Sequence, residues 1–316
     1  MRILVTGGTG LVGKPLVRAL AVNNEVAVFA RTDDIDRPDS VRFISGDIRK
    51  KSELRQAFGR PDIVFHLAAC NDEDDATLFS TNVLGTENVV ALCKEKKVKQ
   101  LVFLSSAGVI GESKTPAKEH SHYNAKTKFD KSKVGAERVI RESGLLYTIV
   151  RVPLILGANA AWAKIFGAIK NGHPIAGSGR NKFHVVHVDD VVGLLLKVFN
   201  NKKATDHVFN IATKDVMTYG EFYDTACKAL RVRNRYKYRH PRVAAALTRV
   251  HWYNTAIRGQ PTAAHMSSSF LNMTTRNCVL SIQKAKDLLD FEPSYTTPAA
   301  IHMTIRDIKT PQVMPG

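Results

Sequence analysis

Residues 3–13 read Ile-Leu-Val-Thr-Gly-Gly-Thr-Gly-Leu-Val-Gly, and this stretch decides the fold. Its apolar start predicts a buried strand, and the amphipathic segment 11–21 predicts a helix that follows directly. Glycines at 7, 10 and 13 permit a tight turn, a close approach of backbone to a pyrophosphate, and close packing of helix on strand. The helix N-terminus would offer unpaired N–H groups to the phosphates. The stretch therefore predicts a dinucleotide-binding loop.

The alternation of apolar runs and amphipathic segments continues through the first half of the chain. Parallel strands that are buried on both faces need helical crossovers, so the pattern predicts an α/β fold with a Rossmann-type, doubly wound parallel sheet. The expected strands are 3–5, 26–29, 41–44, 63–67, 101–104 and 147–152, and the expected helices are 11–21, 78–96 and 131–142.

After Pro153 the pattern becomes looser. It predicts helices at 162–170, 189–199 and 219–230, a strand at 208–211, and one more helix at 282–289 within an otherwise irregular tail, 231–316. Trp162, Phe166 and Ile169 recur at helical spacing, which is typical of core packing but would also suit an apolar wall of a substrate site.

The composition excludes several classes of protein. Of the 316 residues, 44% are hydrophobic and 24% are charged, which excludes disordered and collagen-like chains. No apolar run approaches the roughly 18 residues of a membrane span, and the start of the chain is strand-like rather than a signal peptide. The four cysteines lack the CxxC spacing of a zinc site. We therefore expect a cytoplasmic protein without a metal site.

The charge is strongly positive and unevenly distributed. Lys+Arg exceed Asp+Glu by 46 − 29 = 17, and twelve Lys or Arg with no acid lie between Asp224 and Asp287. The basic segment 231–242 and the apolar positions after it (243–247, 250, 252, 253 and 257) could lie on an anionic membrane, cover a cleft that holds a diphosphate, or form a solvated face. No recognised nucleic-acid module accompanies the charge, so a nucleic-acid partner is not expected.

Several segments, in order, resemble the extended short-chain dehydrogenase/reductase family, which includes NAD-dependent epimerases and dehydratases and 3-beta-hydroxysteroid-dehydrogenase-like enzymes. The match covers residues 1–215. The segments are TGGTGLVG at 6–13, GDI at 46–48, HLAA at 66–69, NVLGT at 82–86, SSAGVIG at 105–111, SK at 132–133, RVP at 151–153 and HVDD at 187–190.

The resemblance implies an NAD(P)-binding domain of residues 1–157 plus 179–213, a substrate-binding region of 158–178 plus 214–316, and a homodimer. Asp47 and Ile48 would flank the adenine, Ala68 and Ala69 would line the cleft, and Asn82 would brace the sheet. The full set of implied cofactor-binding residues is Gly7, Thr9, Gly10, Leu11, Val12, Gly13, Arg31, Asp47, Ile48, Leu67, Ala68, Ala69, Asn82, Lys133 and Pro153.

Arg31 bears on the choice of dinucleotide. NAD enzymes usually place an acid at the end of the second strand, where it binds both ribose hydroxyls. Here the strand ends in Ala30 and Arg31, and the first acid is Asp33. Because Arg31 would pair with a 2′-phosphate, NADP(H) is favoured over NAD(H). The alternative for Arg31 is an ordinary surface arginine.

The implied catalytic residues are Ser106, Phe129 and Lys133. The family uses a tyrosine four residues before the lysine, whose ammonium lowers the pKa of the phenol, and a serine that orients the substrate oxygen. Here Phe129 stands at the tyrosine position, and it has no proton to give. The change is either an engineered Tyr→Phe substitution or a natural departure. Tyr123 and its neighbours Glu119, His120 and His122 are alternative proton donors.

Two acidic motifs have structural interpretations. Residues 72–75 are four consecutive acids, which favour the first turn of a helix over a metal site. Asp189 or Asp190 is expected to cap the helix at 189–199. Nucleotide-sugar members of the family commonly carry Arg-Asp or Arg-Thr just before the HVDD motif, whereas this chain has Asn181-Lys182-Phe183-His184, which is closer to the hydroxysteroid-dehydrogenase-like branch.

Three functions follow from these patterns. The first is an oxidoreductase or epimerase that transfers hydride at a secondary alcohol or ketone of a nucleotide sugar or of a hydrophobic, steroid- or isoprenoid-like substrate, with activity impaired by Phe129. The second is a catalytically silent NADP(H)-binding subunit. The third, favoured only by charge, is a nucleic-acid or membrane binder on the same fold.

Overall fold

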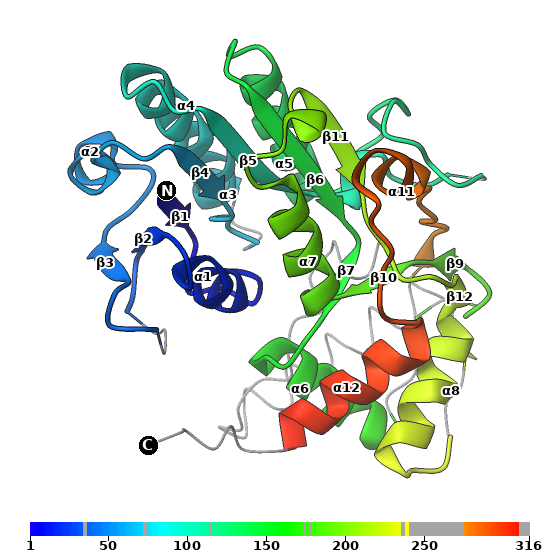
Figure 1. The fold of residues 1–316 in the computed structure, drawn as a ribbon. Helices are drawn as coiled ribbons and strands as arrows, with labels where there is room; N and C mark the ends of the chain where they lie inside the picture. Colours follow the sequence, from blue (N-terminus) through cyan, green and yellow to red (C-terminus); the bar gives the residue numbers. More distant parts are fainter. Residues whose placement is uncertain are drawn as a thin grey trace.

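A seven-stranded parallel sheet forms the centre of the molecule (Figure 1), as the sequence predicts. The computed structural model describes residues 1–33, 37–71, 75–113, 115–172, 175–176, 178–234, 238–239 and 275–309. The strand order is β11-β6-β5-β4-β1-β2-β3. The strands are β1 (Arg2–Thr6), β2 (Glu25–Ala30), β3 (Arg42–Ser45), β4 (Ile63–His66), β5 (Gln100–Ser106), β6 (Tyr147–Val152) and β11 (His207–Asn210).

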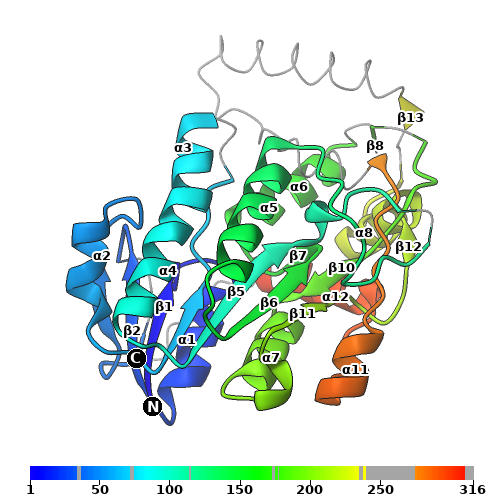
Figure 2. The same ribbon diagram turned by 90° about the horizontal axis from the view of Figure 1, so that it is seen from above.

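Helices cover both faces of the sheet (Figure 2). One face carries α1 (Gly13–Ala21), α7 (Val188–Val198) and α11 (Gln283–Leu289), which share an apolar cluster with the strands. The other face carries α2 (Lys51–Phe58), α4 (Gly85–Glu95) and α5 (Lys128–Arg141), which share a second cluster. The predicted α/β architecture is therefore confirmed, and both faces of the strands are buried, as expected for parallel strands.

The direction of the chain reverses beside β1. From β1 it proceeds to β2 and β3 on one side, and then returns to β4, β5, β6 and β11 on the other. Thr6, at the end of β1, pairs with His66, at the end of β4. Because carboxyl ends of parallel strands lie along one edge, the loops that follow β1 and β4 leave the sheet side by side there, at the point where open α/β sheets bind their ligands.

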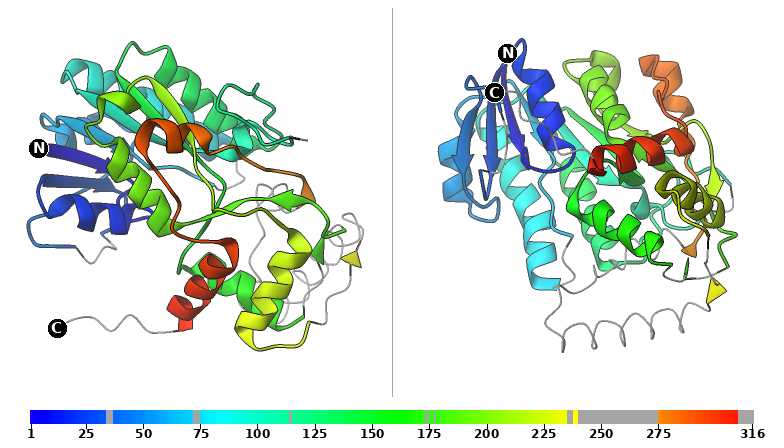
Figure 3. Two further views of the ribbon diagram at one scale, coloured as in Figure 1. Left: turned by 45° about the vertical axis from the view of Figure 1, so that its right-hand side comes forward. Right: turned by 90° about the horizontal axis from the view of Figure 1, so that it is seen from below.

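A third apolar cluster joins α6 (Ala160–Lys170), α8 (Tyr219–Leu230) and α12 (Thr297–Lys309), which lie together below the sheet (Figure 3). Trp162, Phe166 and Ile169 are all buried in it, so their helical spacing reflects core packing. Three short strand pairs accompany these helices: β7 (Leu154–Leu156) with β10 (Val185–His187), β9 (Lys182–Phe183) with β12 (Met217–Thr218), and β8 (Ile175–Ala176) with β13 (Tyr238–Arg239).

Several expected elements differ from those observed. The segment 78–96 is not one regular helix: it contains the end of α3 (Asp75–Phe79), the π-helix η1 (Ser80–Leu84) and α4. Two helices, α2 and α12, were not expected from the sequence. Short 3-10 turns also occur as η2 (Ala107–Val109) and η3 (Lys202–Ala204). The first turn of α12 is stabilised from a distance, because Thr297 N donates to Asp215 Oδ1 (2.6 Å).

The expected cap of the helix at 189–199 was wrong. The N-cap residue of α7 is His187, whose Nδ1 accepts from Asp189 N (3.3 Å). Asp190 is buried, and its carboxylate instead accepts from the backbone N–H groups of Ser294 (2.7 Å) and Tyr295 (3.3 Å). Burial raises the pKa of this carboxyl. Asp190 thus ties the segment before α12 to α7.

Some predictions fall on residues outside the described part of the chain. Of the acidic run, residues 72–74 lie outside it, and Asp75 is the first residue of α3. Of the basic segment and the apolar positions after it, only residues 231–234 and the strand β13 lie inside it. No helix among the described residues combines the length and the apolar character needed to span a membrane.

Candidate active site

Two glycines of the loop after β1 are required by packing. Gly7 has φ +74°, and a Cβ placed on it would lie 2.6 Å from Ala68 N. A Cβ on Gly13, the first residue of α1, would lie 2.4 Å from Gly7 O. Any side chain at either position would collide with backbone, so these glycines allow β1, β4 and α1 to approach one another closely.

Gly10 has no such requirement from the protein. A Cβ there would meet only Gly7 O, at an ordinary 3.4 Å, and the residue is exposed. No side chain caps the N-terminus of α1; within its first turn Lys14 N donates to Gly10 O (3.0 Å), and Pro15 has no N–H group. The loop therefore leaves open space beside a positive helix end, which fits a phosphate group.

The ends of β2 and β3 bring two arginines close to one carboxylate. Asp47 accepts hydrogen bonds from Arg49 N (2.9 Å) and Arg49 Nε (2.8 Å). The hydrogen bonds of Arg49 lower the pKa of Asp47, and the charge of Arg31 contributes in the same direction. Arg31 is exposed, and its carbonyl accepts from Ser45 Oγ (3.1 Å). Ile48 is buried, and a Cβ placed on Gly85 would lie 2.6 Å from Ile48 Cδ1.

Asn82 ties the loop after β4 to α5. Its Oδ1 accepts from Cys70 N (2.7 Å), and its Nδ2 donates to Cys70 O (2.8 Å) and to Ser132 Oγ (2.8 Å). Ser132 Oγ in turn donates to Phe129 O (2.7 Å). One buried amide thus holds the backbone beside Leu67, Ala68 and Ala69 in a fixed position relative to the first turn of α5.

His66 is locked in its neutral form at the end of β4. Thr86 Oγ1 donates to Asn82 O (2.6 Å), so it must accept from His66 Nε2 (2.9 Å). His66 Nδ1 consequently accepts from Thr6 Oγ1 (2.7 Å). Burial lowers the pKa of His66 to about 3, which agrees with this arrangement. The imidazole is therefore a structural link between β1, β4 and α4.

Lys133 is a buried cation with one hydrogen-bond acceptor among the described residues. Its side chain is 4% exposed, and Nζ donates to Leu104 O on β5 (2.7 Å). The ammonium also lies 4.3 Å from the centre of the Phe103 ring. Burial lowers the pKa of Lys133 to about 7, while the charge of Glu137 acts in the opposite direction. Lys133 can therefore gain or lose a proton near neutral pH.

Phe129 lies four residues before Lys133 in the chain, and Ser106 lies on the strand that carries the acceptor of this lysine. Ser106 ends β5, two residues beyond the acceptor of Lys133, and its Oγ accepts from Gly108 N (3.0 Å). Phe129 is half-buried in the first turn of α5 and has no polar side-chain atom. The α5 N-terminus is capped by Thr127 Oγ1, which accepts from Asp130 N (3.0 Å).

Behind Ser106 lies a buried ion pair that sequence reasoning missed. Glu137 on α5 accepts from Arg151 Nε (2.9 Å) and Arg151 Nη2 (2.7 Å) on β6. Its two oxygens also accept from Ser105 Oγ (2.6 Å) and from Tyr123 Oη (2.8 Å). The only signal in the sequence was the position of Glu137 four residues after Lys133, on the buried face of the helix.

The ion pair between Glu137 and Arg151 keeps the phenol of Tyr123 protonated. Desolvation and the neighbouring Glu137 raise the pKa of the phenol, which is already committed as a donor to that carboxylate. The structure therefore gives no support to Tyr123 as a substitute for the missing tyrosine. Glu119 is another of the alternative proton donors. Its carbonyl accepts from Arg151 Nη1 (3.0 Å), and its carboxylate accepts from Asn210 N (3.0 Å).

Asp130 is a second buried carboxyl group near Ser106. Its Oδ1 has no hydrogen-bond partner among the described residues, and Oδ2 accepts from Thr127 Oγ1 (2.6 Å). A Cβ on Gly108 would lie within 1.9 Å of Asp130 Oδ1, so the carboxyl packs directly behind the backbone of η2. Burial raises the pKa of Asp130.

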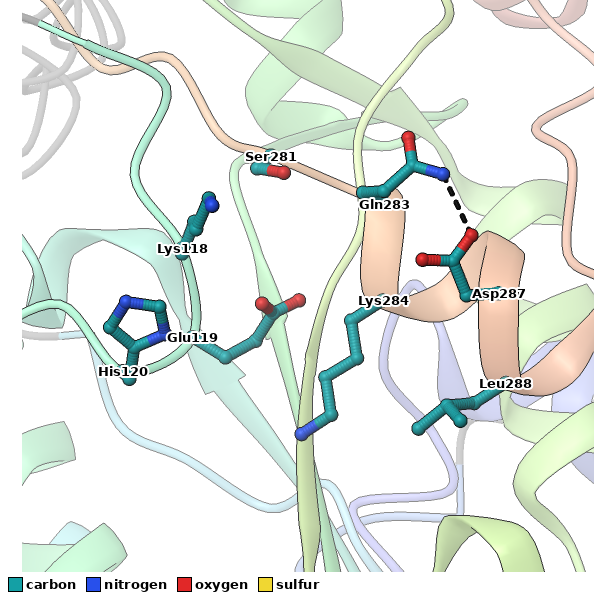
Figure 4. A pocket seen from close by; sticks show the side chains of 8 residues that line it. All are labelled: Lys118, Glu119, His120, Ser281, Gln283, Lys284, Asp287 and Leu288. Carbon is teal, nitrogen blue, oxygen red and sulfur yellow. Dashed lines mark hydrogen bonds between the residues drawn. The ribbon is translucent and has the colours of Figure 1, made fainter.

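Two adjoining cavities lie away from this site, against the edge strand β11. They have volumes of ≈ 330 and ≈ 340 Å³ and share Glu119, His120 and Lys284. Figure 4 shows Lys118 and Glu119 on one wall and Lys284 on the other. Three strands separate β11 from β1, so these cavities are distinct from the site at the glycine loop.

The fold brings the expected cofactor residues together along one edge of the sheet. The glycine loop follows β1, Arg31 follows β2, Asp47 and Ile48 follow β3, and Leu67–Ala69 follow β4. Ser106 ends β5, and Pro153 follows β6. Phe129 and Lys133 lie on α5, whereas Glu119, His120 and His122 lie in the loop between β5 and α5.

Comparison with known proteins places residues 3–212 within the NAD dependent epimerase/dehydratase family. The chain is 27% identical to the uncharacterized protein y4nG of Sinorhizobium fredii over 251 residues, which is 74% of this chain and 62% of that protein, less than two thirds of its length. It is also 27% identical to UDP-glucose 4-epimerase of Vibrio cholerae over 229 residues, which is 66% of this chain and 70% of that enzyme.

The fold has close counterparts among solved structures. UDP-glucose 4-epimerase of Thermus thermophilus, crystallised as a complex with NAD, superimposes with a TM-score of 0.77. The match covers 98% of this chain and 99% of that chain at 24% sequence identity. At this level of identity the likeness concerns the fold.

The buried Lys133 has a measurable consequence for stability. Between about pH 7 and its ordinary pKa of 10.5, the unfolded chain binds a proton that the folded chain releases. The cost of burying the charge is therefore complete below pH 7 and disappears above 10.5. Lys133→Met removes this cost. We therefore expect the difference in unfolding free energy, variant minus wild type, to be larger at pH 6.5 than at pH 10, by on the order of a few kcal/mol.

Urea denaturation at both pH values measures this difference, and the matched control is Lys131→Met, which removes an exposed lysine from the same helix. The loss of apolar contacts of the lysine stem does not depend on pH, so it cancels. A difference between variant and wild type that is the same at both pH values would contradict the assigned burial of charge.

Proposed function

The chain belongs to the NAD dependent epimerase/dehydratase family, and we propose that it binds a nicotinamide dinucleotide at the glycine loop and acts on a secondary alcohol or ketone. When bound, the cofactor supplies the acceptor or donor of hydride. The observation that carries the proposal is the unfilled space at Gly10, beside the uncapped N-terminus of α1. Gly7 and Gly13 are explained by packing within the chain, whereas Gly10 is explained by a ligand.

The residues along the edge of the sheet have matching roles. Residues 9–13 would contact the pyrophosphate, Asp47 and Ile48 the adenine, and Ala68 and Ala69 the cleft wall. Lys133 would contact the nicotinamide ribose, and Ser106 would orient the substrate oxygen. The hydrogen bonds of Asn82 to Cys70 and Ser132 hold the loop after β4 in a fixed position relative to α5.

Arg31 supports NADP(H) as the preferred cofactor. It follows the second strand, where an NAD enzyme usually has an acid, and its charge reaches Asp47. A 2′-phosphate would pair with an exposed arginine at this place. The solved relative from Thermus thermophilus contains NAD, so the preference rests on the residues of this chain alone.

A nucleotide sugar is the substrate that the similarity to UDP-glucose 4-epimerase favours. A hydrophobic alcohol is the second candidate substrate. It is favoured because Phe183 and His184, which precede the HVDD motif, are engaged in contacts within the protein. The ring of Phe183 contacts Tyr219 and Phe222 (5.8 and 5.7 Å between centroids), and His184 Nδ1 accepts from Leu280 N (3.0 Å). Neither residue offers a cation to a diphosphate.

Gly10→Ala tests the placement of the cofactor, with Gly13→Ala as the matched control. In Gly10→Ala, we expect cofactor affinity to fall by about tenfold or more, ~1.4 kcal/mol, with the free energy of unfolding unchanged. In Gly13→Ala, the methyl group meets Gly7 O at 2.4 Å, so the unfolding free energy should fall by about 1–3 kcal/mol. Calorimetric titration and urea denaturation distinguish the two effects. Undiminished affinity in Gly10→Ala would refute the site.

Arg31→Ala tests the cofactor preference. Loss of a charge-assisted contact to the 2′-phosphate should weaken binding of NADP(H) by about 1–3 kcal/mol and leave NAD(H) nearly unaffected. Arg31→Asp should weaken NADP(H) binding further than Arg31→Ala does, because the carboxylate would repel the 2′-phosphate. Equal losses for the two cofactors in parallel titrations would show that Arg31 has no part in the choice.

Phe129→Tyr tests the catalytic assignment. The change adds one phenol oxygen four residues before Lys133, and general acid–base catalysis contributes roughly 10²–10⁴ in rate. We expect turnover to rise by up to that factor on UDP-hexoses or on hydrophobic secondary alcohols, with little change in cofactor affinity. If neither form turns over any substrate while both bind cofactor, the silent-subunit hypothesis replaces the enzymatic one.

A further inference from the structure

Phe129 leaves open which group of this chain can carry a proton beside Ser106. Tyr123 already donates to Glu137, and the pKa of its phenol is raised. His66 is neutral and fully engaged by Thr6 and Thr86. Neither side chain has a proton or lone pair that is free to serve a substrate.

Asp130 is also excluded by its position. Its carboxyl packs behind Gly108, with Oδ1 directly against the backbone of η2. Its Oδ2 is engaged by Thr127 Oγ1. The backbone of η2 therefore stands between this carboxyl and the substrate side of Ser106.

Lys133 differs from all of these groups. Its charged Nζ carries three protons, of which one is given to Leu104 O (2.7 Å). Among the described residues no other acceptor and no ion-pair partner of this ammonium is found. The nearest neighbours are the carbonyl of β5 and the face of the Phe103 ring, 4.3 Å away. The other two protons of the ammonium have no acceptor among the described residues, and Leu104 lies two residues before Ser106 on β5.

The charges around Lys133 explain why its proton is easily exchanged. Glu137, one turn further along α5, is engaged by four donor groups, two of them from Arg151. The carboxylate and the guanidinium compensate each other, and His66 is neutral on the β4 side. Lys133 is then an extra buried positive charge, and burial brings its pKa to about 7. A lysine tuned in this way can act as acid or base at neutral pH.

We propose that Lys133 Nζ is itself the acid–base group of this chain, in the role that the family gives to a tyrosine. This inference rests on the proposed function. In oxidation, the substrate carbon gives up hydride and its hydroxyl proton passes to the neutral amine. The O–H bond breaks, a new N–H bond converts –NH2 to –NH3⁺, and the oxygen electron pair completes the carbonyl. In reduction, the ammonium returns that proton to the oxygen.

The first test measures the proton on Lys133 directly, without cofactor or substrate. Lysine side chains labelled with ¹³C at Cε are followed by NMR from pH 5 to 11. We expect one resonance to titrate near pH 7, to vanish in Lys133→Arg and to persist in Lys131→Arg, which changes an exposed lysine of the same helix. If every lysine titrates above pH 9, the proposal is wrong.

The second test measures turnover in wild type, Lys133→Arg and Phe129→Tyr. Arginine keeps the positive charge but stays protonated, so it cannot accept a proton. Because only the neutral amine is a base, wild-type oxidation should rise with pH through about 7. Lys133→Arg should lose roughly 10²–10⁴ in rate, and Lys131→Arg should lose none.

The double variant Phe129→Tyr/Lys133→Arg separates proton transfer from positioning. With a phenol present, we expect it to regain part of the lost rate. An unimpaired rate in Lys133→Arg would overturn the proposal. Cofactor titration of each variant distinguishes this failure from failure of the proposed function, since the latter would appear as absence of cofactor binding in the wild-type protein itself.

Discussion

The buried ion pair between Glu137 and Arg151 connects the parts on which the site depends. Both side chains are at most 1% exposed, and through them α5 is joined to β6, to Ser105 on β5 and to Tyr123 in the preceding loop. Removing one partner of such a pair typically costs about 3–5 kcal/mol, because a buried charge is left uncompensated. The pair fixes the height of α5 against the sheet, and hence where Phe129 and Lys133 lie relative to Ser106.

The same pair determines the electrostatics of the cleft. Since Glu137 and Arg151 compensate each other, Lys133 receives only partial relief from the carboxylate one turn away. In a site with a tyrosine, a phenol oxygen would lie in the same electrostatic environment as the lysine. Phe129 supplies no such oxygen. One missing oxygen therefore changes the role open to the lysine, from a group that assists a phenol to one that can itself exchange a proton. The apolar ring at 129 leaves the rest of the site intact, including the tie from Ser132 to Asn82.

Much of the fold and of the candidate cofactor site could be predicted from the sequence, because the responsible signals are local. The strand, glycine loop and helix at 2–21 lie together in the chain, and the later strands repeat the same pattern. Elements stabilised from a distance were missed. The first turn of α12 depends on Asp215, 82 residues earlier, although Pro298 just inside the helix was a local signal. Nothing local in the sequence connects Glu137 to Arg151, which β6 places against it from 14 residues further along the chain. His187 was overlooked as a cap because histidine rarely has that role.

We propose that the loops after β1 and β4 bind a nicotinamide dinucleotide. The most direct measurement is a titration of the unaltered protein with NADPH and NADH, following the fluorescence of the reduced nicotinamide. The account requires saturable binding of one dinucleotide per chain, with the tighter binding for NADPH. Absence of saturable binding for both cofactors up to millimolar concentration would contradict it.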